Sequence, residues 1–203
     1  MNPPTAALTP DRILDAAEDV LRRFGPAKTN VVDVARALGV SHASVYRHFP
    51  TKAALRDAVA QRWLTRVSTP LAELVAEDGP ATDRLWRWLE LLSQIKRTMM
   101  LDDPELFATY HTLALDSREV TKEHVGMLAG QAAKIIADGI ASGEFADVDP
   151  AVAGRAFLHA TAWFHNPAQA AEWSDPNLDA DLKAVWTLLL SGLAANTPIG
   201  TRT

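Results

Sequence analysis

Apolar residues recur in this chain at the three- to four-residue spacing of a helix. The first stripe follows Thr9-Pro10, precedes Gly25-Pro26 and comprises Ile13, Ala17, Val20, Leu21 and Phe24. Threonine favours the capping position of a helix, proline fits its first turn, and a glycine followed by proline ends it. The pattern therefore predicts an amphipathic helix from about residue 10 to residue 24.

The same periodicity continues along the chain, and we find no run of β-branched residues with the alternation that a strand requires. Breaks are expected at Gly39, Pro70, Gly79-Pro80 and Asp175-Pro176, where glycine or proline interrupts the pattern. Further helices are predicted at about residues 30–38, 41–49, 51–68, 82–100, 104–115, 118–142, 150–165 and 178–195. The expected fold class is all-α.

Charge is distributed unevenly between the two ends of the chain. The segment from Asp11 to Arg66 has ten basic and six acidic residues, a net of +4. Since the whole chain has a net charge of -5, the remainder carries -9. A basic segment joined to an acidic one suggests that only the first meets a polyanion. We place a domain boundary near Val67, which gives domains at residues 1–67 and 68–203.

Several classes of protein fit the sequence poorly. There is no cysteine, which excludes disulfides, cysteine-bound zinc and a thiol nucleophile. A glycine-rich phosphate loop and a G-x-S-x-G elbow are also missing, so we expect no enzyme and no cofactor. His159 and His165 are six positions apart, which does not suit a metal site on one helix face. The N-terminal residues lack the features of a signal peptide, and the apolar stretch at 184–195 is too short to cross a bilayer. We expect a cytoplasmic protein without membrane contact.

Two short predicted helices meet at the sequence Leu38-Gly39-Val40-Ser41. A glycine in a tight turn between two short helices is typical of a helix-turn-helix, in which the second helix enters the major groove of DNA. Val45 and Phe49 are expected to face the first two helices, which turns Ser44, Arg47 and His48 outward. An ordinary helical hairpin with a solvated polar face fits this spacing equally well.

The stretch from Thr29 to Leu55 resembles the DNA-binding domain of the tetracycline-repressor (TetR) family. The matching features are Asp33-Val34-Ala35, Gly39-Val40-Ser41, Tyr46-Arg47-His48-Phe49, Lys52 and Leu55. The resemblance implies that Tyr46 and His48 contact phosphates, that Ser41 to Ser44 and Arg47 face the groove, and that Lys52 adds a contact from the fourth helix. The family commonly has glycine and threonine where this chain has Ala43-Ser44, which should alter the bases that are read.

The predicted architecture is an N-terminal three-helix helix-turn-helix domain followed by a larger helical domain for ligand binding and dimerisation. The position of Lys28 and Thr29 before the second helix also suits a phosphate contact. The expected DNA-binding residues are Lys28, Thr29, Ser41, His42, Ala43, Ser44, Tyr46, Arg47, His48 and Lys52.

The acidic C-terminal part shows no comparably specific motif. The expected effector is apolar or aromatic with one or two hydrogen-bonding groups, in a pocket of Trp88, Phe107, Tyr110, His111, Leu128, Phe157, Thr161 and His165. The alternative is that these side chains form an ordinary helix core. The last predicted helix is apolar around much of its circumference, which favours burial in a homodimer over a central position in a monomer. The expected dimer contacts are Phe164, Trp186, Leu189, Leu190 and Leu193.

The predicted function is a ligand-responsive, sequence-specific transcriptional regulator, most simply a repressor that a small molecule releases from its operator. Its partners would be a pseudo-palindromic double-stranded DNA operator, a second copy of the chain and the unidentified effector. The sequence leaves repressor and activator open, because the sign of regulation depends on where the operator lies relative to a promoter.

Overall fold

The computed structural model describes residues 7–25 and 30–194, and these residues form helices joined by turns. The only pairing of strand type among them is an isolated bridge between Phe145 and Ala194. The chain divides into two compact units. The first unit contains the residues up to Thr65 together with Asp103–Lys122, and the second contains Arg66–Asp102 and the residues from Glu123 onward. The predicted all-α fold class is confirmed.

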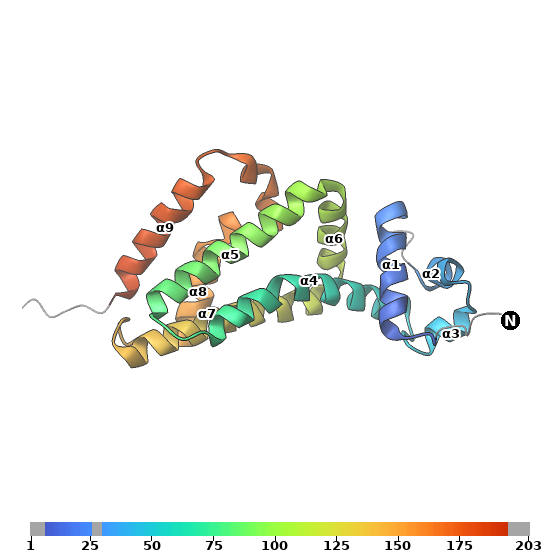
Figure 1. Ribbon diagram of the computed structural model, residues 1–203, viewed down its shortest axis with the longest axis horizontal. Helices are drawn as coiled ribbons and strands as arrows, with labels where there is room; N and C mark the ends of the chain where they lie inside the picture. The colour runs from blue at the N-terminus through green and yellow to red at the C-terminus, as the bar shows by residue number, and fades with distance from the viewer. Residues whose placement is uncertain (1–6, 26–29, 195–203) are drawn as a thin grey trace, which may run out of the picture. The chain divides into compact units, whose positions relative to one another are not determined.

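The first unit contains the basic N-terminal helices (Figure 1). They are α1 (Pro10–Phe24), α2 (Val31–Leu38), α3 (His42–Tyr46) and the start of α4 (Lys52–Ala76), and the unit also includes α6 (Pro104–Asp116). The apolar stripe of α1 faces inward, since Ile13 and Leu21 are fully buried. Thr9 caps α1 by accepting a hydrogen bond from the amide of Arg12 at 3.3 Å, as the sequence predicted.

The second unit contains the rest of α4 and four further helices (Figure 1). They are α5 (Ala81–Asp102), most of α7 (Arg118–Ser142), α8 (Pro150–Ala160) and α9 (Leu178–Leu193), with short 3₁₀ turns at Ala162–Phe164 and Pro167–Ser174. The carboxylate of Glu144 accepts hydrogen bonds from the amides of Ala81 and Thr82 at 2.9 and 3.0 Å. The end of α7 therefore lies beside the start of α5, and the two helices run antiparallel.

Helix α8 packs closely on α7 because residue 154 is glycine. A Cβ atom at Gly154 would lie 2.6 Å from the carbonyl oxygen of Ala129 and 2.7 Å from the amide nitrogen of Ala133. Both are backbone atoms, which cannot move aside as the end of a side chain can. This approach fixes α8 against the middle of α7 and positions the residues that follow Gly154.

Three predicted boundaries were wrong. Helix α4 continues through Pro70 to Ala76, so this proline removes one amide donor without ending the helix. Helix α8 ends at Ala160 and not near His165, because Thr161 leaves the helical conformation and the chain tightens into a 3₁₀ turn. Helix α3 ends at Tyr46, although Phe49 still donates its amide to the carbonyl of Val45 at 3.0 Å.

The division of the chain into units places a boundary inside α4, between Thr65 and Arg66. It also assigns Asp103–Lys122 to the first unit, which neither the charge pattern nor the helix pattern indicated. Among the helices at residues 7–25 and 30–194, none is long and apolar enough to cross a membrane.

Candidate nucleic-acid interface and interior binding site

The turn between α2 and α3 is built by three residues with distinct roles. Asn30 caps α2 by accepting from the amides of Val32 and Asp33 at 2.9 and 3.1 Å. Gly39 ends α2 in the left-handed conformation, with φ 67° and ψ 29°, which costs glycine little. The amide of Val40 then reaches back to the carbonyl of Ala35 at 3.0 Å, so the chain reverses within a few residues.

Helix α3 begins at a serine cap and is held by its apolar face. Ser41 Oγ accepts from the amide of Ser44 at 3.2 Å, while Val45 is fully buried and Phe49 nearly so. The opposite face is open to solvent, and its exposed residues are Ser41, His42, Ala43, Tyr46, Arg47 and His48. The structure thus gathers six of the residues predicted for DNA contact on one exposed side, at the second helix of a helix-turn-helix.

The predicted DNA contacts differ in how firmly they are held. Ser44 is half-buried, and its hydroxyl lies 2.9 Å from Ser41 Oγ and 3.4 Å from Arg47 Nη2. Ser44 therefore orients Arg47 more than it projects outward itself. Lys52 is exposed in the first turn of α4, where Thr51 caps the helix through the amide of Ala54 at 3.0 Å. Lys28 and Thr29 lie outside the described residues.

Ion pairs brace α4 within the first unit. Arg62 on α4 lies 2.5 Å from the carboxylate of Asp15 and 3.6 Å from that of Glu18, both on α1. Arg56, also on α4, lies 2.6 Å from the carboxylate of Asp116 at the end of α6. These ion pairs hold α1, α4 and α6 together within the first unit.

Three of the residues predicted for the ligand pocket belong to the first unit. Phe107 and Tyr110 are buried and pack on Trp63 of α4, with the tyrosine ring stacked at a centroid distance of 5.1 Å and the phenylalanine ring edge-on at 6.0 Å. His111, on the same helix α6, is half-buried. Within this unit the aromatic pair forms a packed cluster with Trp63.

The other five predicted pocket residues lie in the second unit and are buried there: Trp88, Leu128, Phe157, Thr161 and His165. The rings of Trp88 and Phe157 are 6.4 Å apart. The indole nitrogen of Trp88 donates to the side-chain oxygen of Gln131 at 3.0 Å. The side-chain nitrogen of Gln131 in turn donates to the carbonyl of Ser68 at 3.1 Å. The structure thus brings Trp88 and Phe157 together in the interior of the unit.

Thr161 and His165 form a second interior pair. The hydroxyl of Thr161 lies 2.9 Å from the carbonyl of Phe157 and 3.1 Å from His165 Nε2. Which of the two groups donates depends on the tautomer of the imidazole, and the contact holds the orientation of the ring.

Two further polar residues share this interior, and neither was predicted from the sequence. Lys96 on α5 and His124 on α7 are each 4% exposed, and His124 Nε2 has no hydrogen-bond partner. Burial lowers the pKa of Lys96 to about 8. Burial, and then the nearby charge of Lys96, lower the pKa of His124 to about 4 and that of His165 to about 4. Both histidines are therefore neutral near pH 7.

The helical spacing of the apolar residues on α5 could have identified Lys96 as a buried residue. Leu85, Leu89 and Leu92 mark the inward face of α5, and Lys96 follows Leu92 at the same helical spacing. A lysine at a core position is rare unless it has a partner or a role. His124 stands in the same way before Leu128 on the buried face of α7.

A second buried cation in the unit has a structural explanation. Arg84, near the start of α5, donates to the carbonyls of Val75 and Glu77, each at 3.1 Å, and to the carboxylate of Asp138 at 3.0 Å. These contacts tie the end of α4 to α5 and α7. Arg84 is therefore explained as a helix-joining residue. In the described parts of the chain, no group of three or more metal-ligating side chains is close enough to hold an ion.

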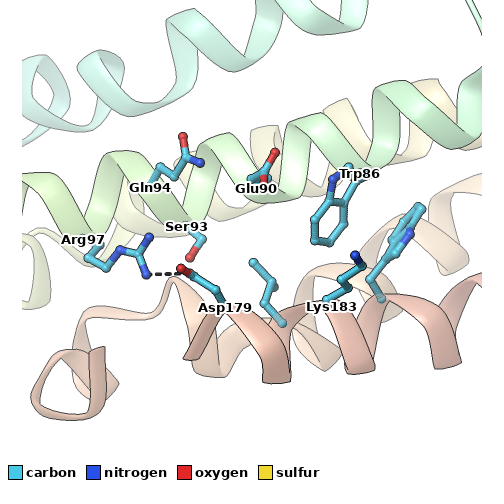
Figure 2. Close-up of a pocket in the computed structure, with 9 residues that line it drawn as sticks. Trp86, Glu90, Ser93, Gln94, Arg97, Asp179 and Lys183 are labelled. Atoms are coloured by element: carbon cyan, nitrogen blue, oxygen red, sulfur yellow. Dashed lines mark hydrogen bonds and ion pairs between the residues drawn. The ribbon is translucent and has the colours of Figure 1, made fainter. Parts of the chain in front are cut away.

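A surface pocket of about 440 Å³ lies between α5 and α9 (Figure 2). Arg97 and Asp179 close one end through an ion pair of 2.7 Å, and Trp86 lies towards the other, beside Lys183. The lining mixes both signs of charge and is open to solvent. It contains none of the residues that the sequence analysis placed in the ligand pocket.

An apolar groove of about 480 Å³ runs between α8 and α9. Val152 and Leu188 are 53% and 75% exposed there, although both are apolar. Of the predicted dimer contacts, Leu189, Leu190 and Leu193 are half-buried along α9, while Phe164 and Trp186 are buried inside the unit. The outward apolar surface is thus formed by α8 together with α9.

The sequence matches known families over both units. Residues 13–59 match the family described as bacterial regulatory proteins, tetR family, and residues 81–186 match the family described as tetracyclin repressor-like, C-terminal domain. The second match covers more than half of the chain. The protein belongs to the TetR family of bacterial regulatory proteins.

Curated relatives include regulators of the same kind. An uncharacterized HTH-type transcriptional regulator of Mycobacterium tuberculosis, Rv1255c, is 35% identical over 107 residues, 52% of this chain and 50% of the relative. The chain thus spans about half the length of such mycobacterial relatives. The HTH-type transcriptional repressor KstR2 of Rhodococcus jostii is 27% identical, over 96% of this chain and 98% of the relative.

Solved structures with the same fold include two regulators. SmeT, the repressor of a Stenotrophomonas maltophilia multidrug efflux pump, superposes with a TM-score of 0.64 at 20% identity, covering 95% of this chain and 93% of its own. The regulator FadR of Bacillus subtilis, in complex with stearoyl-CoA, superposes with a TM-score of 0.60 at 21% identity, covering 91% and 99%. These likenesses show the fold.

Proposed function

We propose that this chain is a ligand-responsive, sequence-specific DNA-binding regulator that represses transcription until a small molecule releases it from its operator. The observation that carries the proposal is the polar face of α3. Tyr46 is exposed together with Arg47 and His48, which follow the helix, while Val45 of the helix and Phe49 just after it are buried in the core. The named repressors among its relatives support the same reading.

On DNA, the exposed residues would make base contacts or phosphate contacts according to their chemistry. Arg47 can donate two parallel hydrogen bonds to a guanine edge, and the Ser44 hydroxyl holds it in that direction. His42 stands at the start of the helix, where base edges are reached. Tyr46, His48 and Lys52 supply donors for phosphates, which fix register without reading sequence. Lys28 and Thr29 are proposed as further phosphate contacts.

The proposed regulator acts as a homodimer through the groove of α8 and α9. Helix-turn-helix proteins commonly read two half-sites, so a two-fold partner matches a pseudo-palindromic operator. Val152 and Leu188 offer apolar area that a second copy would remove from water. Leu189, Leu190 and Leu193 extend this surface, and Phe164 and Trp186 support it from beneath.

Effector binding in the helical body would alter DNA affinity by shifting the population of two states. A ligand can shift that equilibrium only by its difference in affinity for the two. In the second unit, the proposed effector site comprises Trp88, Leu128, Phe157, Thr161 and His165. Phe107, Tyr110 and His111 remain separate proposals for the first unit.

The test is fluorescence anisotropy of the full chain on the DNA that flanks its own gene, with an unrelated fragment as control, at physiological salt. We expect binding at least about 10³-fold tighter to the flanking fragment, as for specific regulators. Arg47→Ala should lower that selectivity, whereas Arg155→Ala, the same charge change on exposed α8, should not. Equal affinity for both fragments would contradict the proposal, and a promoter reporter would distinguish repression from activation.

A further inference from the structure

Four polar side chains, of types that usually lie at the protein surface, are buried together in the second unit. They are Lys96, His124, Thr161 and His165, and none is more than 7% exposed. They come from α5, from α7, and from the end of α8 with the turn after it. Lys96 is close enough to both histidines for its charge to act on each ring.

The packing of the helices explains why these residues meet. Since α5 and α7 run antiparallel, Lys96 late in α5 lies at the level of His124 early in α7. Gly154 holds α8 against Ala129 and Ala133 of α7, and Thr161 follows two turns later. One end of the helical body is therefore polar inside.

An apolar layer lies next to this polar end. Trp88 precedes Lys96 by about two turns on α5, Leu128 follows His124 by one turn on α7, and Phe157 precedes Thr161 by one turn on α8. All three are buried, and the rings of Trp88 and Phe157 are 6.4 Å apart. On each of these three helices, a hydrogen-bonding side chain at the polar end thus has a large apolar side chain at the neighbouring level.

Such an interior is costly for the protein alone. Burying an unmatched polar atom loses hydration that apolar packing does not replace. His124 Nε2 is fully enclosed and has no partner, and Thr161 and His165 already use one hydrogen bond on each other. Side chains that reduce stability in this way are typical of functional sites.

We propose that this cluster is the head-group subsite of the effector and that the effector is an amphipathic carboxylic acid, with its carboxylate at Lys96 and His124 and its apolar body beside Trp88 and Phe157. The inference rests on the proposed function, because it specifies the effector of that regulator. One lysine with two neutral histidines matches a single negative charge. A phosphate would require more positive charge or the forked donors of arginine.

The first experiment is isothermal titration calorimetry on the full chain with octanoate and 4-phenylbutyrate, each beside its neutral amide. The variants are Lys96→Met and, as a matched control, Lys183→Met at the surface pocket of Figure 2. The wild type should bind at least one acid about tenfold more tightly than its amide, the size expected for a charge-assisted hydrogen bond. Lys96→Met should bring this ratio to about one, while Lys183→Met should leave it unchanged.

Three results would overturn the inference. They are binding of neither acid at millimolar concentration, an equal acid preference in wild type and Lys96→Met, and loss of the preference in Lys183→Met instead.

A pair of variants at His124 distinguishes a loss of acid preference from a folding defect. His124→Gln places an amide donor near the position of Nε2 and should retain most of the acid preference, whereas His124→Leu should reduce it. DNA binding is measured on the same proteins without ligand. Selective DNA binding without acid preference overturns this inference and leaves the proposed function standing, while loss of selective binding in the wild type contradicts the proposed function itself.

Discussion

The two units of this protein differ in whether their functional polar side chains are exposed or buried. The first unit buries apolar side chains such as Val45 and exposes Tyr46 and Arg47. The second unit encloses Lys96 and His124 and exposes apolar residues such as Leu188. A polar face turned outward suits a large charged partner such as DNA, and an enclosed polar cluster suits a small molecule that loses its water on binding.

This difference has consequences for stability. Substitution of an exposed polar residue typically changes folding free energy by less than about 0.5 kcal/mol, whereas a buried ionisable group changes it by several times as much. Residues of the DNA face should therefore affect binding with little effect on folding. Residues of the interior should affect both.

The largest effect should be acid destabilisation of the second unit. His124 and His165 have pKa values of about 4 in the folded protein, below the usual 6.5, so the unfolded chain binds protons that the folded chain does not. Stability should be complete above pH 6.5 and fall as the pH drops towards 4, by up to about 3 kcal/mol per histidine. Urea unfolding at pH 7.5 and pH 4.5 measures this loss.

The matched control is His159→Gln on the exposed face of α8. It should leave the pH dependence unchanged, while His165→Gln should reduce it. Identical pH profiles for wild type and His165→Gln would show that the burial of this imidazole has no energetic consequence.

The next effect concerns the outward apolar surface. Leu188→Glu places a charge at a position that is 75% exposed in the single chain and central to the groove of α8 and α9. If a second copy covers the groove, the dimer should weaken by roughly a hundredfold, as at an interface hot spot. Light scattering after size exclusion reports the mass. Val125→Glu, at an apolar position on α7 that is 42% exposed, should remain dimeric, and an unchanged mass for Leu188→Glu would place the interface elsewhere.

A smaller effect is expected at the contact between α7 and α8. Gly154→Ala places a methyl group 2.6 Å from a backbone oxygen, so the helices must separate, at a cost of about 1–3 kcal/mol. Gly130→Ala on α7 meets nothing within 4 Å and should stabilise the helix by up to about 1 kcal/mol. Thermal melts of the two variants should therefore shift in opposite directions. A stabilising Gly154→Ala would contradict the close packing that positions Thr161.

The smallest effect should come from Ser44. Removing its hydroxyl with Ser44→Ala frees Arg47, at a cost of about 0.5–1 kcal/mol per half-site, or a few-fold in operator affinity. Anisotropy titrations measure this change, and the melting temperature should stay within about one degree because the pair is exposed. A loss as large as that of Arg47→Ala would mean that Ser44 itself reads a base.

Much of the DNA face could be predicted from the sequence because its determinants are local. Asn30, Gly39 and Ser41 each act within five residues of their partners, so cap and turn preferences identify them. The inward direction of Val45 and Phe49 follows from helical spacing. The exception is the length of α4, since Pro70 is accommodated in a helix whose other hydrogen bonds continue on both sides.

The interior cluster could not be assembled from the sequence because its parts lie far apart along the chain. Thr161 and His165 were selected as a pair four positions apart on one predicted helix, yet they meet across the 3₁₀ turn that follows the end of α8 at Ala160. Lys96 and His124 depend on the antiparallel packing of α5 and α7, which no local pattern specifies. The assignment of Phe107 and Tyr110 to the first unit depends in the same way on tertiary contacts with Trp63.

The most direct test of this account compares Arg47→Ala and Lys96→Met in one anisotropy experiment on the flanking DNA. We predict that Arg47→Ala loses at least about tenfold in selective affinity, the cost of one good base contact, while Lys96→Met binds as the wild type does in the absence of ligand. If Arg47→Ala bound the flanking fragment as tightly as the wild type, or if Lys96→Met lost selectivity to the same degree, the division between an outer DNA face and an inner effector site would be contradicted.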